Sequence, residues 1–111
     1  MTLLNELESI VGNHHVLTQG DLSAFEMDWR KRSKGRALCV VSPANTQEVA
    51  MVIKACAAHN TSVVPQGGNT GLVVGSIPDE TGQQVLLSLK RMRKIESIDP
   101  ENLSITVQAG C

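Results

Sequence analysis

The spacing of apolar residues predicts one helix at the start of the chain. Within residues 2–11, leucine, isoleucine or valine stands at positions 3, 4, 7, 10 and 11, which places them on one helical face. Gly12 suits the end of that helix. The polar residues that follow, and then residues 21–29, have no clear period, and residues 30–36 are predicted to form a loop because Ser33 and Gly35 interrupt any helix.

The next pattern predicts a strand, a helix and a second strand. The apolar run at residues 37–41, closed by Ser42 and Pro43, is typical of a buried strand. Asn45 and Glu48 form a capping-box pattern at the start of a helix that extends to about residue 60. Residues 62–65 are predicted to form the second strand, so the unit is βαβ with parallel strands and a right-handed crossover.

Three further strands are expected in the second half of the chain. Residues 84–89 read as one strand, and residues 95–98 and 104–109 as two strands joined by a turn at residues 99–102. Ile105, Val107 and Ala109 alternate with polar residues, which predicts that this last strand is half-buried. The fold class is therefore α+β.

A glycine-rich loop directly follows the strand at residues 62–65. Gly67, Gly68 and Gly71 leave the backbone free of side chains and tolerate positive φ, so successive N–H groups can converge on an anion. Asn69 and Thr70 add side-chain donors. The loop has no Gly-Lys-Ser/Thr string and does not open a helix, which excludes the two common phosphate-binding motifs. From the glycines alone, an anion-binding loop and a simple turn remain equally open.

The string at residues 65–72, PQGGNTGL, resembles the FAD pyrophosphate loop of the PCMH-type flavoproteins, the vanillyl-alcohol oxidase and p-cresol methylhydroxylase superfamily. It is most similar to the D-2-hydroxyacid dehydrogenase branch, which includes D-lactate dehydrogenases, glycolate oxidase flavin subunits and D-2-hydroxyglutarate dehydrogenases. Nearly the whole chain carries the resemblance, at residues 28–29, 35–37, 41, 43, 46–49, 87–89, 91–92 and 107–111.

The resemblance implies a PCMH-type FAD-binding subdomain and a set of residues that line the cofactor. These residues are Pro65, Gln66, Gly67, Gly68, Asn69, Thr70, Gly71, Leu72, Gly75 and Ser76. Val74 departs from the family, which commonly has glycine at this position. Arg36 stands where the family often keeps a basic residue, and it is a further candidate to approach the cofactor.

The implied parent enzyme oxidises a small D-2-hydroxy acid to a 2-oxo acid by hydride transfer to FAD. Its electrons then pass to a quinone, an electron-transfer flavoprotein or another acceptor. No catalytic or metal-binding residue is nominated in this chain, because the family's catalytic and metal-binding histidines lie beyond Cys111. We expect the sequence to be an N-terminal part of a larger protein, inactive alone, with residues 1–36 as a lead-in and residues 37–111 as an incomplete FAD domain truncated at its C-terminal end.

Composition and charge reduce the number of other functions that the chain could have. The 111 residues carry a formal net charge of −1 and two aromatic residues, Phe25 and Trp29. These values argue against nucleic-acid binding, although residues 30–36 hold five basic side chains that we interpret as a solvated loop. We interpret Trp29 as a packing anchor and His59 as a helix-ending residue.

No apolar run is long enough for a membrane span. Three unpaired cysteines, Cys39, Cys56 and Cys111, indicate reduced thiols and a cytoplasmic location, with peripheral contact at the inner face of the membrane left open. Another PCMH-type alcohol or sugar-lactone oxidase, and a standalone anion- or RNA-binding α+β module, are the alternative functions.

Overall fold

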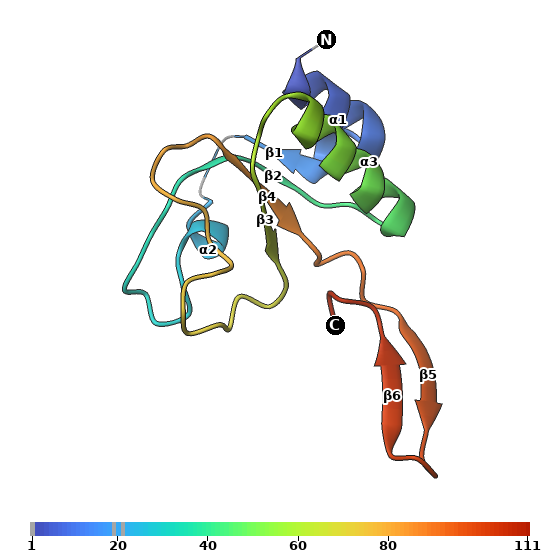
Figure 1. Cartoon of the computed structure of the whole chain (residues 1–111). Coiled ribbons are helices and arrows are strands. Elements are labelled where there is room, and N and C mark those ends of the chain that lie inside the picture. The colour runs from blue at the N-terminus through green and yellow to red at the C-terminus, as the bar shows by residue number, and fades with distance from the viewer. Residues whose placement is uncertain (1, 19, 21) are drawn as a thin grey trace.

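The computed structural model describes residues 2–18, 20 and 22–111 and forms a mixed sheet with two long helices and a separate hairpin (Figure 1). The helices are α1 (Leu3–Val11), the short 3₁₀ turn η1 (Asn13–His15), α2 (Ser23–Glu26) and α3 (Thr46–Ala58). The strands are β1 (Val16–Leu17), β2 (Ala37–Val41), β3 (Val63–Gln66), β4 (Gln84–Ser88), β5 (Ile95–Asp99) and β6 (Ser104–Val107). No helix in the described part of the chain is long and apolar enough to cross a bilayer.

Both long helices begin where the sequence predicts. Thr2 caps α1 by accepting a hydrogen bond from the backbone N–H of Asn5, and Asn45 caps α3 by accepting one from Glu48 at 2.8 Å. The second half of the capping box is shifted by one residue, because the Glu48 carboxylate accepts from the N–H of Ala44. Gly12 ends α1 with φ +92°.

The main sheet has the order β1-β2-β4-β3, in which β2, β4 and β3 are parallel and β1 pairs antiparallel with β2. The predicted βαβ unit is present as β2, α3 and β3, but β4 lies between its two strands. The sequence also gave no sign of β1, since two residues are too few for a period to be visible. Both differences reflect pairing between distant segments, which local patterns do not encode.

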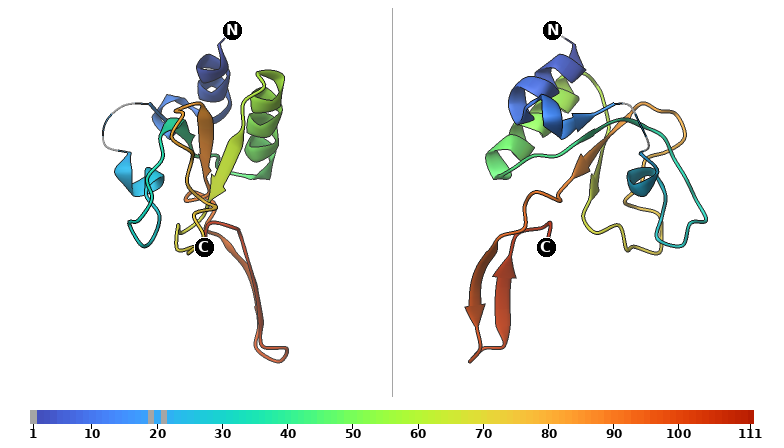
Figure 2. Two further views of the ribbon diagram at one scale, coloured as in Figure 1. Left: turned by 60° about the vertical axis from the view of Figure 1, so that its left-hand side comes forward. Right: turned by 180° about the vertical axis from the view of Figure 1, so that it is seen from behind.

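The core lies between the sheet and the helix pair α1 and α3, which lie side by side (Figure 2). Alternate residues of β2 and β4 face these helices, among them Cys39, Val41, Val85 and Leu87. The intervening Val40 and Leu86 are also fully buried, so both faces of the central strands are covered. This explains why these strands read as unbroken apolar runs.

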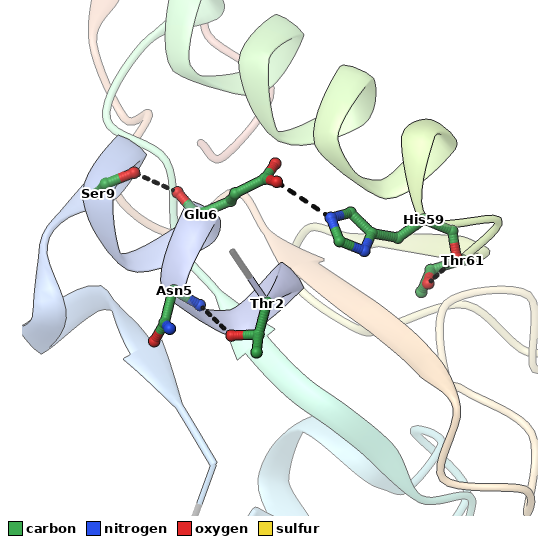
Figure 3. Close-up of polar contacts among 6 residues, drawn as sticks. All are labelled: Thr2, Asn5, Glu6, Ser9, His59 and Thr61. Carbon is green, nitrogen blue, oxygen red and sulfur yellow. Dashed lines mark hydrogen bonds and ion pairs between the residues drawn. The ribbon is translucent and has the colours of Figure 1, made fainter.

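A polar contact also joins the two helices at their exposed side (Figure 3). His59, the C-cap of α3, places Nε2 3.1 Å from Oε1 of Glu6 on α1. The interpretation of His59 as a helix-ending residue is therefore confirmed, and the residue has this additional partner.

The β5–β6 hairpin leaves the body of the molecule as a two-stranded ribbon (Figures 1 and 2). The prediction of a half-buried last strand is wrong for these residues, because β6 ends at Val107 and all four of its residues are exposed. The alternation of apolar and polar residues is real, but no described residue covers the apolar side.

Candidate functional site

The glycine-rich loop begins at the carboxyl end of β3 and runs to β4. Because β2, β3 and β4 are parallel, their carboxyl ends meet at one edge of the sheet. In open parallel sheets this edge is where ligands bind. The loop thus lies at the position where the fold itself favours a binding site.

The backbone of this loop is free to receive a ligand. Within the described residues, no backbone N–H from Gly67 to Gly71 donates a hydrogen bond to another part of the chain. Gly67, Gly68, Thr70 and Gly71 are also exposed. A run of accessible, uncommitted N–H groups can bind the oxygens of an anion.

The space above the loop glycines is open. A Cβ added at Gly71 or Gly75 would have no heavy atom within 4 Å, and one at Gly68 would meet only the Thr70 methyl group at 3.9 Å. Packing within the described chain therefore does not require glycine at these positions. Glycine keeps the backbone accessible to something outside the chain.

Two other glycines have the opposite role and serve as a contrast. A Cβ at Gly35 would lie 1.7 Å from the carbonyl oxygen of Pro78, and one at Gly110 would lie 1.8 Å from that of Leu89. These glycines allow two backbone segments to touch, so packing within the fold requires glycine at both positions.

Buried and half-buried polar side chains hold the loop in place. Gln66 is buried, and its Nε2 donates to the carbonyls of Phe25 (2.7 Å) and Ser76 (3.0 Å). Asn69 donates from Nδ2 to the carbonyl of Met27 at 2.6 Å and accepts from the Ser76 hydroxyl at 2.8 Å. Gln66, Asn69 and Ser76 thus tie the start and end of the loop to the α2 segment.

This arrangement changes the expected role of Asn69. Its side-chain amide was predicted to donate to the anion, but the amide nitrogen is committed to the Met27 carbonyl. The contribution that Asn69 can make to a ligand is its backbone N–H. The sequence could not reveal this partner, because it is the backbone carbonyl of Met27, 42 residues away.

The loop glycines do not use the positive φ that glycine tolerates. Between residues 67 and 76 the residues with positive φ are Asn69 and Val74, both at +56°, whereas Gly67, Gly68, Gly71 and Gly75 have none. Asparagine tolerates this region, but a β-branched residue is strained there. Val74 therefore holds a conformation that suits glycine, the residue that the resemblance places at this position.

A cleft of about 840 Å³ opens beside the loop. Its lining joins the loop to the segment at residues 23–31 and comprises Ser23, Ala24, Met27, Asp28, Trp29, Lys31, Gly68 and Asn69. The interpretation of Trp29 as a packing anchor is wrong for this structure, since 61% of Trp29 is exposed.

The basic segment at residues 30–36 forms an exposed loop, as predicted, apart from the buried Gly35. Asp28 shapes it by accepting hydrogen bonds from the backbone N–H groups of Arg32 (2.7 Å) and Ser33 (2.9 Å). The bond from Ser33 is the main cause that lowers the pKa of Asp28 below its usual value. Arg36 is exposed, and its N–H donates to the Asp79 carbonyl.

The cysteines divide into two kinds. Cys39 and Cys56 are buried in the core, and burial raises the pKa of the Cys39 thiol to about 12. Cys111 is exposed. The expected reduced, unpaired thiols are therefore present, and the two buried ones serve packing.

The parallel sheet edge, the open glycine faces and the uncommitted amides are together the features of a site that can receive an anion. Comparison with known proteins identifies the family to which this domain belongs. The family model described as "FAD binding domain" matches residues 37–111. The chain therefore belongs to this family of FAD-binding domains.

Similar proteins include D-2-hydroxyglutarate dehydrogenases. The chain is 40% identical over 105 residues to the "Probable D-2-hydroxyglutarate dehydrogenase, mitochondrial" of Oryza sativa subsp. indica and 36% identical to the mitochondrial D-2-hydroxyglutarate dehydrogenase of Arabidopsis thaliana. Each alignment covers 94% of this chain and 18% of the relative. The chain thus spans under a fifth of the length of these relatives.

The solved structures are consistent with the same family. A substrate-bound p-cresol methylhydroxylase superposes with a TM-score of 0.77 at 26% identity, over 97% of this chain and 22% of that chain. The 4-ethylphenol oxidase of Gulosibacter chungangensis has a TM-score of 0.78 at 21% identity, over 98% of this chain and 22% of that one, and supports the fold. The predicted PCMH-type α+β fold is confirmed.

Proposed function

We propose that the glycine-rich loop holds the pyrophosphate of FAD through its backbone amides. The observation that carries this proposal is the set of uncommitted N–H groups from Gly67 to Gly71, beneath open space that a Cβ would fill. A hydrogen bond from an amide to a charged oxygen contributes about 1.5–3 kcal/mol, so three or four suffice for firm binding. The proposed cofactor-lining residues are Pro65, Gln66, Gly67, Gly68, Asn69, Thr70, Gly71, Leu72, Gly75 and Ser76.

Some of these residues contact the phosphates, and others hold the loop in its conformation. The loop glycines and the backbone of Asn69 contact the phosphates, while the side chains of Gln66 and Ser76 fix the path of the loop. This support fixes the direction of the amides before the ligand arrives, which reduces the entropy lost on binding.

The supporting contacts also bear on the domain organisation that we propose. Residues 37–111 form the first part of the FAD domain, and residues 1–36 form a lead-in. The lead-in supplies the Phe25 and Met27 carbonyls that hold the loop.

We further propose that the complete enzyme oxidises a D-2-hydroxy acid to a 2-oxo acid. The similarity to D-2-hydroxyglutarate dehydrogenases over 94% of this chain supports this activity. FAD, when bound, supplies the hydride acceptor for the substrate C2 hydrogen. The described residues of this chain bind and orient the cofactor, and none is assigned as a general base.

Electron transfer and location complete the proposal. The reduced enzyme passes its electrons to a quinone, an electron-transfer flavoprotein or another acceptor. The buried free thiols of Cys39 and Cys56 suit a reducing compartment, and we propose the cytoplasm, although the plant relatives are named as mitochondrial. Cell fractionation with an antibody to this chain would distinguish the two compartments.

The test uses a chimera in which residues 1–111 replace the matched region of the Arabidopsis enzyme. We expect the purified chimera to retain flavin and to reduce a dye with D-2-hydroxyglutarate, while residues 1–111 alone remain inactive with D-2-hydroxyglutarate, D-lactate or glycolate plus FAD. The L-isomer of the substrate is the control. A folded chimera without flavin would contradict the FAD proposal.

A further inference from the structure

The turn that follows α2 presents a tryptophan and three consecutive cations at the surface. Trp29 is 61% exposed, and the neighbouring Arg30, Lys31 and Arg32 are exposed as well. We call residues 29–32 the basic turn. More than half of a large aromatic ring is therefore in contact with solvent, directly beside a concentration of positive charge.

The buried Asp28 holds the basic turn in a defined conformation. Its carboxylate accepts hydrogen bonds from the backbone N–H groups of Arg32 (2.7 Å) and Ser33 (2.9 Å). Its own N–H donates to the Ser33 carbonyl at 3.1 Å, and its carbonyl accepts from the N–H of Lys31 at 3.0 Å. These four bonds close the turn at residues 28 and 33, so residues 29–32 form its apex before any partner binds.

The positive charge of the basic turn is not neutralised within the described chain. None of the ion pairs among the described residues involves a residue of the turn. Asp28 is buried, and Oδ1 of its carboxylate is engaged by backbone N–H groups. Lys34, further along the same loop, lines a small pocket with Asp79 and Glu80 and is therefore not counted with the turn. Since the net charge of the chain is −1, this is a local field that attracts an anionic surface.

The position and size of the basic turn favour a lipid surface over a folded protein. The segment between α2 and β2 lies on the opposite side of the sheet from α3 (Figures 1 and 2). A specific protein–protein interface takes roughly 20–30 residues from each partner, whereas the turn offers four. A fluid bilayer requires no such extended complementary surface. Trp29 and Lys31 also line the cleft beside the glycine-rich loop, so a surface bound at the turn lies next to that loop.

We infer that the basic turn attaches the protein to a bilayer that contains anionic phospholipid. The three cations bind the phosphate groups of the lipid heads, and the Trp29 ring enters the interfacial region, where tryptophan is enriched in membrane proteins. Each Lys or Arg near such a surface strengthens binding about five-fold, so the three together contribute on the order of a hundred-fold. The inference does not depend on the FAD proposal.

Vesicle binding of residues 1–111 tests the inference. The probes are vesicles of phosphatidylcholine alone and of an equimolar mixture of phosphatidylcholine and phosphatidylglycerol. Because Trp29 is the one tryptophan in the sequence, its fluorescence reports on the basic turn directly. We expect emission at shorter wavelength, and co-sedimentation, with the mixed vesicles alone. Salt at about 0.5 M, which shortens the Debye length to a few ångströms, should release the chain. Unchanged emission or no co-sedimentation with the mixed vesicles would overturn the inference.

Matched charge variants distinguish the basic turn from general attraction to an anionic surface. The test variant replaces the three cations of the turn, as Arg30→Gln, Lys31→Gln and Arg32→Gln. The control removes the same number of charges from exposed residues elsewhere, as Lys54→Gln, Arg93→Gln and Lys94→Gln. The test variant should bind the mixed vesicles about a hundred-fold more weakly, and the control should bind like the unaltered chain. An equal loss in both variants, or no loss in the test variant, would contradict a role for the turn.

A soluble phosphate and an acidic protein are the competing occupants. Displacement from the vesicles by sn-glycerol 3-phosphate, at a concentration equal to that of the lipid heads, would assign the turn to a small phosphate ligand. Binding to poly-L-glutamate as strong as that to the mixed vesicles would assign it to an acidic protein. Either result would overturn the inference.

The Arabidopsis chimera extends the test to a complete flavoprotein. We expect the chimera to co-sediment with the mixed vesicles and to lose this binding when it carries the three substitutions of the turn. Circular dichroism checks that both proteins remain folded. A folded chimera that does not bind the vesicles would show that the turn is covered in the complete protein, and would overturn the inference.

Discussion

Packing within the fold requires glycine at position 35 but not at position 71, so Gly35→Ala should destabilise the fold and Gly71→Ala should not. A Cβ at Gly35 would lie 1.7 Å from the Pro78 carbonyl oxygen and 2.7 Å from that of Asp79. Both neighbours are backbone atoms, so the two segments must separate. Overpacking of this kind typically costs about 1–3 kcal/mol. The hydrogen bond from the Arg36 N–H to the Asp79 carbonyl, worth about 1 kcal/mol, is strained at the same time.

Gly71→Ala should be neutral or stabilising. No heavy atom lies within 4 Å of the added Cβ, and Gly71 has no positive φ. Alanine then restricts the unfolded chain and stabilises the fold by about 0.4–1 kcal/mol. The two variants should therefore differ by roughly 1.5–4 kcal/mol, the sum of these estimates.

Urea unfolding of residues 1–111, followed by far-ultraviolet circular dichroism, measures this difference. With a denaturant slope of about 1.5 kcal/mol per molar, the two midpoints should be separated by roughly 1–2.7 M. Equal midpoints, or a larger loss in Gly71→Ala, would refute the division between packing glycines and ligand-facing glycines.

Three other perturbations test separate parts of the structure. Val74→Gly should leave the chain at least about 1 kcal/mol more stable than the control Val73→Gly in urea unfolding, because only Val74 holds a strained positive φ. Burial raises the Cys39 pKa from 9.0 to about 12, so the protonated thiol favours the folded state below pH 9. This contribution to the free energy of unfolding is lost as the pH rises from 9 to about 12. Urea unfolding measured across this pH range should show the loss, and Cys39→Ala should make the loss smaller. A double-mutant cycle of Glu6→Gln and His59→Gln should give a coupling of at most about 1 kcal/mol that falls with salt, since both side chains are partly exposed.

Local sequence patterns predicted most of the elements because their causes are local. Both long helices have caps within three residues of their first turn, and β2 and β4 are apolar runs buried on both faces. The order of the strands was not predictable, because the insertion of β4 between β2 and β3 depends on contacts far apart in sequence. The exposure of β6 was missed because a half-buried pattern does not say what covers it.

The loop shows the same division between local and distant causes. Its glycines and its position after a strand were visible in the sequence. The commitment of the Asn69 amide to the Met27 carbonyl was not, since any residue type supplies a backbone carbonyl. The positive φ of Val74 was signalled only by the resemblance, which places glycine there.

Flavin retention by Gly68→Val in the Arabidopsis chimera tests the central claim most directly. The nearest atom to an added Cβ is the Thr70 methyl group at 3.9 Å, so the fold has room for this first carbon, while the space proposed for the pyrophosphate becomes filled. The ratio of flavin absorbance to protein should fall at least ten-fold, with the urea midpoint of residues 1–111 carrying the same change shifted by less than about 0.7 M, equivalent to about 1 kcal/mol. Wild-type flavin content in this variant would contradict the account.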